Sequence, residues 1–241
     1  MEPSVKKEPL DRGGFLINVS KHHTFGTDAV LLSRFANAKK SDLLCDLGTG
    51  CGIIALLMLC DGNLKEAHGV DISEEAVSLC QKTKEELNLE NFFPLCSDLN
   101  DLKGKLPFGE FSLITCNPPY KAAGAGIVNP DSVDRTARHE TACTLDDILS
   151  VSAKLLSFGG RLCMCHRPER TAELLEKMRK HKIEPKKMRF VAQRKGEEPW
   201  LVLVEGKRGG KTGMRISDTL YVEEQGNLSE EMLKIYGKYK G

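Results

Sequence analysis

Short apolar runs alternate with segments of helical period between Leu43 and about Glu205, and this alternation limits the fold more than any other feature. Strand, helix, strand, helix along a chain is typical of an α/β protein with a mostly parallel sheet and helices on both faces. An apolar helix is expected to start near Gly52. The expected strands are Leu43–Leu47, Ala67–Asp71, Phe92–Cys96, Phe111–Cys116, Arg161–His166, Met188–Gln193 and Trp200–Glu205.

Two further helix starts are visible in the sequence. Ser73 is followed by two glutamates, the pattern of an N-cap with acids in the first turn. Thr144 and Asp147 resemble a capping box. They predict a helix that runs through Leu156 and is stopped by Gly159-Gly160.

The connection before the last strand fixes that strand's direction. Gly196 to Pro199 is too short for a parallel crossover, so the last strand should run antiparallel to its neighbour. The length suits one domain, with a core at 41–205, an N-terminal extension at 1–40 and a C-terminal extension at 206–241. The longest apolar run, Ile53 to Cys60, is too short for a membrane span or signal peptide. A soluble, cytoplasmic protein is expected.

Nine cysteines are present, an odd number, and no two have Cys-x-x-Cys spacing. Most lie inside apolar runs. They are expected to be free, buried thiols in a reducing compartment, and no metal site is predicted.

The net charge of +1 conceals an uneven distribution. The segment from His166 to Arg215 holds fifteen Lys and Arg against seven acids, so the rest of the chain carries a net charge of −7. A basic final third indicates a polyanionic partner, although a solvated charged face has the same composition.

A glycine-rich loop joins the first core strand to the first core helix. Gly48, Gly50 and Gly52 let the backbone approach a ligand and leave helix amides free to face it. The third glycine comes one residue too early for a dinucleotide fingerprint. Asp46 also disfavours a pyrophosphate, because a carboxylate is better suited to a cationic amino group.

Two more acids follow later strands. Asp71, nineteen residues after Gly52, is placed to accept from both ribose hydroxyls. Asp98 follows the next strand and is suited to an exocyclic adenine amine. Together with Asp46, these acids predict a site for a nucleoside that carries a positively charged amino acid, at the carboxyl edge of the sheet.

The chain thus resembles the S-adenosylmethionine-dependent methyltransferases with a Rossmann-like sheet. The segment Asp46 to Gly52 matches their first motif, Asp71 their ribose-binding acid and Asp98 their adenine-contacting acid. The resemblance implies S-adenosylmethionine as cofactor and a seven-stranded sheet whose last strand is antiparallel.

The fourth strand ends in Asn117-Pro118-Pro119-Tyr120. Two prolines stiffen the loop and remove two amide donors, so the loop presents acceptors. The Asn117 side-chain oxygen and the Pro118 carbonyl can hold both hydrogens of an adenine amine, which aims its nitrogen at the sulfonium methyl. Tyr120 offers a face on which the target ring can stack.

This tetrapeptide resembles the fourth motif of methyltransferases that act on amines conjugated to a π system. Their substrates are adenine N6, guanine N2 and the glutamine amide of release factors. The resemblance implies that Asn117 and Pro118 bind the target nitrogen and that Pro119 and Tyr120 complete the catalytic loop.

Further segments resemble the bacterial tRNA(Val) adenine-N6 methyltransferase family, which modifies the adenine beside the anticodon. They are Phe25 to Leu32, Ala137 to Glu140, Arg167 to Arg170 and Leu201 to Gly206, together with the Asn-Pro-Pro-Tyr loop. The resemblance implies that Gly26-Thr27-Asp28 packs over the methionine end of the cofactor, although Thr27 or Asp28 as a helix N-cap is an equally good interpretation. The expected cofactor-binding residues are Thr27, Asp28, Asp46, Gly48, Gly50, Gly52, Asp71, Ile72, Asp98 and Asn117.

Basic residues around the loop and the last strands are expected to form a track for RNA phosphates, which would position tRNA without reading its sequence. His139 is interpreted as a packed or capping residue more readily than as an acid or base. The expected RNA-binding residues are Lys121, Arg135, Arg138, Lys186, Lys187 and Arg189.

Several functions remain open on the sequence. The first is methylation of adenine N6 in tRNA, by a monomer or homodimer without membrane or metal partners. A protein-glutamine N5 methyltransferase is an alternative, but those families carry a sizeable helical domain before the glycine loop, whereas Gly48 follows only 47 residues. Methylation of rRNA adenine or guanine, and a non-enzymatic cofactor-binding scaffold, are the others.

Overall fold

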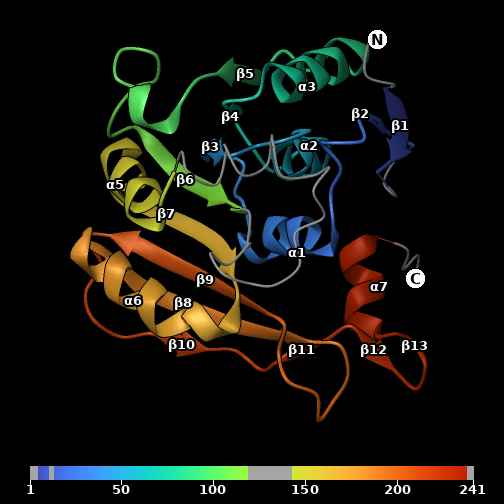
Figure 1. Cartoon of the computed structure of the whole chain (residues 1–241), viewed down its shortest axis with the longest axis vertical. Coiled ribbons are helices and arrows are strands. Elements are labelled where there is room, and N and C mark those ends of the chain that lie inside the picture. Colours follow the sequence, from blue (N-terminus) through green and yellow to red (C-terminus); the bar gives the residue numbers. More distant parts are fainter. Residues whose placement is uncertain (1–4, 11–13, 119–142, 238–241) are drawn as a thin grey trace, which may run out of the picture.

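A twisted sheet of nine strands forms the centre of the computed structural model, which describes residues 5–10, 14–118 and 143–237 (Figure 1). The strand order is β10-β8-β9-β7-β6-β3-β4-β5, and β11 also pairs with β8. The strands are β3 (Leu43–Leu47), β4 (Glu66–Asp71), β5 (Phe92–Cys96), β6 (Phe111–Cys116), β7 (Leu156–His166), β8 (Ile183–Ala192), β9 (Leu201–Arg208), β10 (Arg215–Ile216) and β11 (Leu220–Tyr221).

All seven predicted strands are present, and β9 runs antiparallel to both β7 and β8, as the short connection requires. The sheet is mostly parallel, which confirms the expected fold class. It is wider than expected because two strands of two residues each, β10 and β11, add along β8. Strands this short leave no periodic pattern in a sequence.

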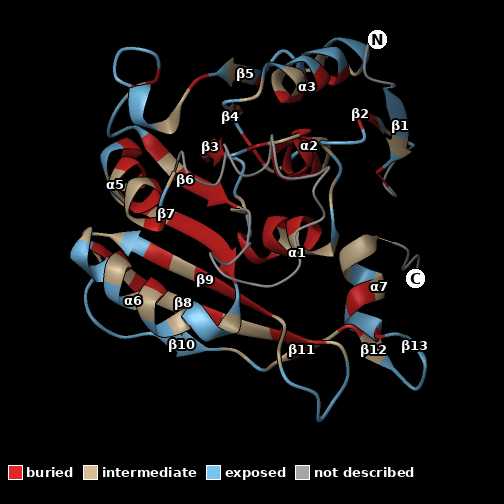
Figure 2. Ribbon diagram, viewed as in Figure 1, coloured by how far each residue is buried: buried red, intermediate tan, exposed pale blue. Residues whose placement is uncertain are grey.

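Helices cover both faces of the sheet. On one face lie α1 (Thr27–Phe35), α2 (Ile53–Cys60) and α3 (Glu74–Glu86); on the other lie α5 (Leu145–Leu155) and α6 (Thr171–Lys180). Successive side chains of a strand point to opposite faces of the sheet, so each strand contributes to two hydrophobic cores. Leu44 packs in one core and Cys45 in the other. Figure 2 shows α1 and α2 almost wholly buried, whereas α3 and α6 expose one side.

The smaller elements lie around this core. A hairpin of β1 (Lys6–Pro9) and β2 (Leu16–Val19) lies against α3, where the buried backbone amide of Asn18 donates to the Thr83 hydroxyl at 2.9 Å. The remaining elements are η1 (Leu99–Asp101), η3 (Pro168–Arg170), β12 (Glu223–Glu224), β13 (Asn227–Leu228) and α7 (Glu230–Tyr236). No helix in the described part of the chain is long and apolar enough to cross a membrane.

The predicted helix starts at Ser73 and Thr144 are confirmed, the second as a complete capping box with Asp147. The predicted end of the second helix was wrong. Helix α5 ends at Leu155, and β7 begins at Leu156, whose backbone is extended. Gly159-Gly160 lies inside this strand, where a Cβ on Gly160 would stand 2.8 Å from the Phe111 carbonyl oxygen, so glycine there permits close strand packing.

All nine cysteines are free. Burial was predicted correctly for most of them, but Cys96, at the end of β5, is exposed. The prediction was wrong there because the strand lies at the edge of the sheet.

Candidate active site

The five strands β3 to β7 pair in parallel, so their carboxyl ends lie along one edge of the sheet. This is the edge at which open α/β sheets bind ligands. The glycine loop follows β3, Asp71 ends β4, Asp98 follows β5 and Asn117 follows β6. The strand register therefore brings together four segments that are far apart in the sequence.

The glycine loop has the backbone that its sequence requires. Gly48, Gly50 and Gly52 have φ angles of 71°, 55° and 83°, in the left-handed region. A Cβ on Gly48 or Gly50 would meet no described atom within 4 Å, whereas one on Gly52 would stand 2.9 Å from Cys80 Sγ. The first two glycines thus leave the backbone open to a ligand, and the third allows close packing against α3.

Asp46 is buried beneath this loop. One carboxylate oxygen accepts from the Thr49 hydroxyl at 2.7 Å, and the other accepts from the Thr115 hydroxyl at 2.6 Å. Burial raises the pKa of Asp46 to about 6, although both hydrogen bonds oppose that shift. The carboxylate therefore ties β3 to the loop and to β6, and it adds negative charge below the loop rather than on its surface.

Asp71 holds the loop from the neighbouring strand. Its Oδ2 accepts from the Gly50 amide at 2.8 Å, and its Oδ1 accepts from the Ser73 amide at 2.9 Å. Ile72 is 44% exposed and provides an apolar surface beside the carboxylate. Both residues lie at the carboxyl end of β4, beside the glycine loop.

Asp98 follows β5 and is half-buried. Its Oδ1 accepts from the Asn100 amide at 2.8 Å, so it caps η1. Asp98 thus has a local structural role. Its position after the end of β5 is the position that the sequence predicted.

Asn117 stands at the end of β6 and is held on both sides. Its Nδ2 donates to Asp28 Oδ2 at 3.1 Å, and its Oδ1 accepts from Cys165 Sγ at 3.1 Å. Pro118 is half-buried next to it. The other predicted residues of the loop, Pro119 and Tyr120, lie outside the described residues.

Gly26, not Thr27 or Asp28, is the N-cap of α1, so the N-cap interpretation was wrong. The Thr27 hydroxyl lies 3.0 Å from the Tyr236 hydroxyl of α7. Asp28 Oδ1 accepts from the Ala29 amide at 2.9 Å, which leaves Oδ2 for Asn117. The Asp28 carboxylate therefore joins the first turn of α1 to the end of β6.

The basic residues predicted to bind RNA divide into two groups. Lys186, Lys187 and Arg189 lie on β8, and each has an intramolecular contact. Lys186 Nζ donates to the carbonyls of Lys211 and Gly213 at 2.9 and 2.6 Å, Lys187 Nζ lies 4.5 Å from the centre of the Phe35 ring, and Arg189 pairs with Glu231 at 2.6 Å. Lys121, Arg135, Arg138 and also His139 lie outside the described residues.

Sequence reasoning missed three side chains of this site: Cys165, Thr115 and His23. Cys165 and Thr115 contact Asn117 and Asp46, and His23 Nε2 lies 3.0 Å from the Ser73 hydroxyl. Cys165 follows from strand pairing. Cys116 of β6 pairs with Met164 of β7, so the next residues on the two strands, Asn117 and Cys165, lie side by side. His23 left no signal in the sequence, since it lies in an irregular segment.

The strand order and the glycine loop are those of a Rossmann-like fold, and the family that the chain matches makes the protein a methyltransferase that uses S-adenosylmethionine. A model of the methyltransferase small domain family matches residues 19–193, and the chain belongs to that family.

Relatives and solved structures agree with this assignment. A protein of Parabacteroides distasonis named tRNA1(Val) (adenine(37)-N6)-methyltransferase is 28% identical over 182 residues, 75% of each chain. One of the same name from Yersinia pestis is 29% identical over 175 residues, 68% of each chain.

The fold is shared with more distant proteins. The crystal structure of a predicted O-methyltransferase from Agrobacterium tumefaciens superposes with a TM-score of 0.68 at 18% identity, covering 88% of this chain and 96% of that one. The geranyl diphosphate C-methyltransferase of Streptomyces coelicolor, in complex with S-adenosyl-L-homocysteine, gives 0.55 at 14% identity, covering 75% and 74%.

Proposed function

We propose that the protein transfers the methyl group of S-adenosylmethionine to N6 of an adenine in tRNA, the adenine beside the anticodon (position 37) of tRNA(Val). The observation that carries the proposal is Asn117, whose side-chain amide is held at the strand end next to the glycine loop. The names of the relatives from Parabacteroides distasonis and Yersinia pestis support the choice of acceptor.

The cofactor is proposed to lie along the strand ends, with its methionine part near Thr27, Asp28 and the glycine loop. Asp71 and Ile72 would hold the ribose, and Asp98 the adenine. Bound there, S-adenosylmethionine supplies an electrophilic methyl group. Asp46, buried below the loop, would favour the two positive charges of the cofactor without touching them.

The proposed reaction depends more on how the acceptor amine is positioned than on a general base. In the proposed step the N6 lone pair forms a bond to the methyl carbon as the carbon–sulfur bond breaks and the electron pair stays on sulfur. One N6 proton then passes to water, because the methylated nitrogen is briefly cationic and strongly acidic. Asn117 Oδ1 and the Pro118 carbonyl would accept from the amine hydrogens and aim its lone pair.

Replacing Asn117 tests this assignment. We expect Asn117→Ala to lower the single-turnover rate of methyl transfer to unmodified tRNA by about 100-fold or more, as loss of one oriented hydrogen bond does in other group transfers. The dissociation constant for S-adenosylmethionine, measured by calorimetry, should stay within about threefold of wild type. A variant that turns over normally would show that Asn117 does not touch the acceptor.

The same acceptors would also hold a glutamine amide, because both substrates present an NH₂ group conjugated to a π system. Labelled S-adenosylmethionine should therefore be offered to unmodified tRNA, to ribosomal RNA and to a release factor in parallel. Nucleoside mass spectrometry of the tRNA product is expected to give N6-methyladenosine at position 37. Label in the release factor or in rRNA alone would overturn the tRNA proposal, and label in none would favour a cofactor-binding scaffold.

A further inference from the structure

Asp28 lies 89 positions before Asn117 in the chain, yet the two side chains are in direct contact. The contact determines which way the Asn117 amide is turned. A carboxylate only accepts hydrogen bonds, so the NH₂ group of Asn117 must face Asp28 and the carbonyl oxygen must face away. The Cys165 thiol donates to that oxygen at 3.1 Å, which favours the same orientation from the opposite side.

Asp28 is itself fixed in place. Its Oδ1 accepts from the Ala29 amide in the first turn of α1, where a negative charge is favoured by the helix dipole. Gly26 makes room for this arrangement, since a Cβ there would stand 2.7 Å from Asp28 Oδ1. The buried face of α1 then anchors the helix against α2 and β7.

We propose that Asp28 is a positioning residue for methyl transfer, which holds the Asn117 amide with its oxygen presented to the acceptor amine. The inference rests on the proposed function, in which Asn117 Oδ1 accepts from that amine. Without Asp28, the amide loses the acceptor that requires its NH₂ group to face α1. A 180° turn would then present that NH₂ group to the acceptor NH₂, and two donors repel each other.

The main variant is Asp28→Asn, which keeps a cap on Ala29 but removes the obligatory acceptor. With its oxygen on the Ala29 amide, the new side chain points an NH₂ group at Asn117, so the Asn117 amide turns over. We expect the single-turnover rate at saturating S-adenosylmethionine to fall by about 10- to 100-fold, the range that misplacement of a catalytic group produces.

A double-mutant cycle with Asn117→Ala separates this role from a direct one in cofactor binding. In the Asn117→Ala background, Asp28→Asn should change the rate less than about threefold, because the side chain that it positions is gone. An equal loss in both backgrounds would overturn the inference. So would a variant whose only defect is a raised dissociation constant for S-adenosylmethionine.

A second variant, Gly26→Ala, moves the carboxylate without removing its charge, and we expect it to reproduce the rate defect. The matched control is Asp61→Asn, which removes a carboxylate that pairs with Arg34 at the other end of α1, at 2.6 Å. The control should keep the wild-type rate. A Gly26→Ala protein with the wild-type rate would count against the inference.

A measurement without turnover keeps this test independent of the acceptor. In ¹⁵N-labelled protein, the side-chain NH₂ signals of Asn117, assigned by their loss in Asn117→Ala, should shift in Asp28→Asn and Gly26→Ala but not in Asp61→Asn. Unshifted signals would overturn the inference even in an active enzyme. If the signals shift but no RNA or release factor is methylated, the contact between Asp28 and Asn117 stands and the proposed function is wrong.

Discussion

The carboxylate of Asp46 is completely enclosed, and two threonine hydroxyls are its described hydrogen-bond donors. Its pKa of about 6 lies above the 3.8 of an exposed aspartate, so the folded state binds its proton more tightly than the unfolded state does. The stability that this group contributes is therefore present below about pH 4 and is lost as pH rises through about 6.

A neutral replacement isolates this effect from the other titrating groups. We expect Asp46→Asn to gain stability relative to wild type between pH 4 and pH 7, by about 3 kcal/mol for a shift of roughly two pKa units. The measurement is urea denaturation of both proteins across that range. A difference that does not change with pH would mean that Asp46 stays ionised throughout.

At the scale of elements, Arg161 of β7 joins three parts of the fold at the amino edge of the sheet. Its guanidinium donates to Asp42 Oδ2 at 2.9 Å, to Glu205 Oε2 of β9 at 3.1 Å and to the carbonyl of Ala36 after α1 at 2.7 Å. All three charged side chains are less than 20% exposed. The network therefore fixes α1 and β9 against the centre of the sheet.

Removing the guanidinium would leave the buried carboxylate of Asp42 and the half-buried carboxylate of Glu205 without their cation. We expect Arg161→Met to lower the free energy of unfolding by about 3 kcal/mol, as breaking a buried ion pair does. Arg194→Met is the control, because Arg194 pairs with Glu223 at 2.6 Å on the exposed surface, where solvent screens the pair. Urea denaturation that finds equal losses in the two variants would contradict the structural role of Arg161.

The elements also show what the sequence can and cannot predict. Strands such as Leu43–Leu47 were predicted to the residue, because a short, mostly apolar run that follows Asp42 and ends at a glycine loop has few other interpretations. The start of β8 was predicted five positions late, since Pro185 and two lysines interrupt its apolar pattern and the pairing with β9 shifts there. Tertiary pairing, which the local sequence does not contain, decides that strand.

The site divides in the same way. Asp71 and the glycines were located by sequence because their spacing follows from one strand-loop-helix-strand unit, β3-α2-β4. The contact of Asp28 with Asn117 was not, because it depends on how α1 lies across the ends of β6 and β7. No spacing rule connects residues from separate layers.

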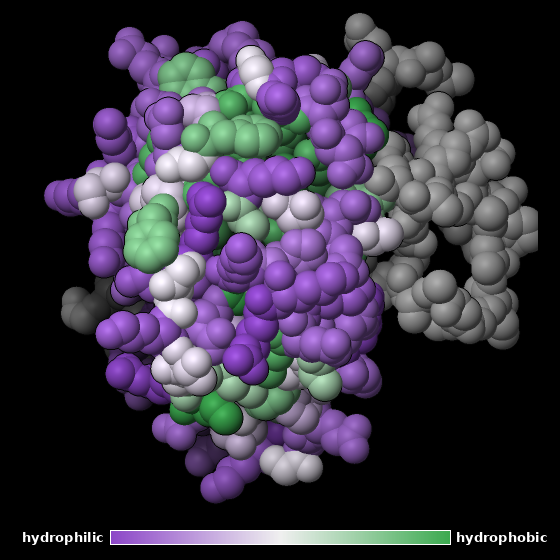
Figure 3. Space-filling model, turned by 90° about the vertical axis from the view of Figure 1, so that its left-hand side faces the viewer, coloured by the Kyte–Doolittle hydropathy of each residue, from purple (hydrophilic) through white to green (hydrophobic). Residues whose placement is uncertain are grey.

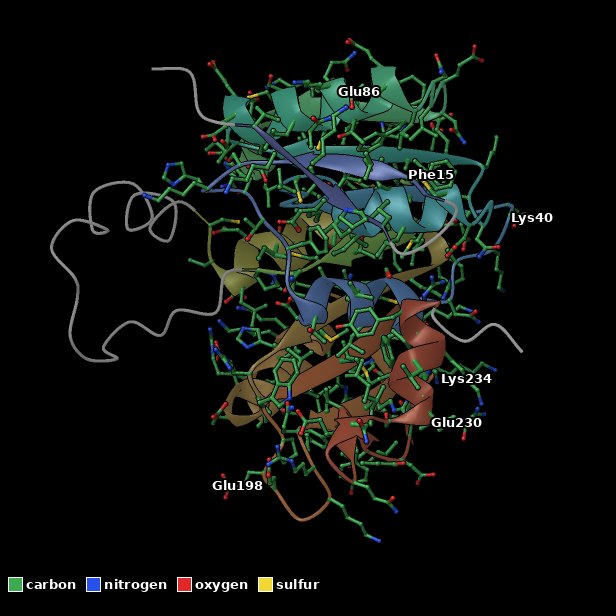
Figure 4. The ribbon with its side chains drawn as sticks, turned by 90° about the vertical axis from the view of Figure 1, so that its right-hand side faces the viewer. Phe15, Lys40, Glu86, Glu198, Glu230 and Lys234 are labelled. Atoms are coloured by element: carbon green, nitrogen blue, oxygen red, sulfur yellow. The ribbon has the colours of Figure 1, made fainter. Side chains whose placement is uncertain are left out.

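At the scale of the whole molecule, the amino and carboxyl edges of the sheet lie on opposite sides (Figure 4). Figure 4 shows Lys40, which precedes β3 at the amino edge, on the opposite side of the molecule from Glu198 in the turn between β8 and β9. The face formed by α5 and α6 is mainly hydrophilic (Figure 3), and Asp146 at the start of α5 pairs there with Lys177 and Lys180 of α6. Ion pairs therefore neutralise part of the basic final third.

Charge reversal on β8 tests the proposed phosphate track. We expect Lys186→Glu with Lys187→Glu to weaken tRNA binding and to lower the slope of log affinity against log salt by about one to two, because fewer counterions are released. Cofactor affinity should not change. Lys39→Glu with Lys40→Glu, an adjacent exposed pair at the amino edge, is the control and should bind tRNA nearly as wild type. An unchanged slope for the β8 variant would place the RNA elsewhere.

The ion pair between Arg189 and Glu231 changes how such a salt titration must be interpreted. The two terminal guanidinium nitrogens donate to the two carboxylate oxygens of Glu231 at 2.6 and 2.8 Å, and Nε donates to the Asp218 carbonyl at 2.8 Å. A phosphate that binds Arg189 must first displace Glu231 of α7. The displaced carboxylate then attracts counterions from solution. Binding at this arginine would exchange one anion for another, so the salt slope would count fewer phosphates than the number in contact with the protein.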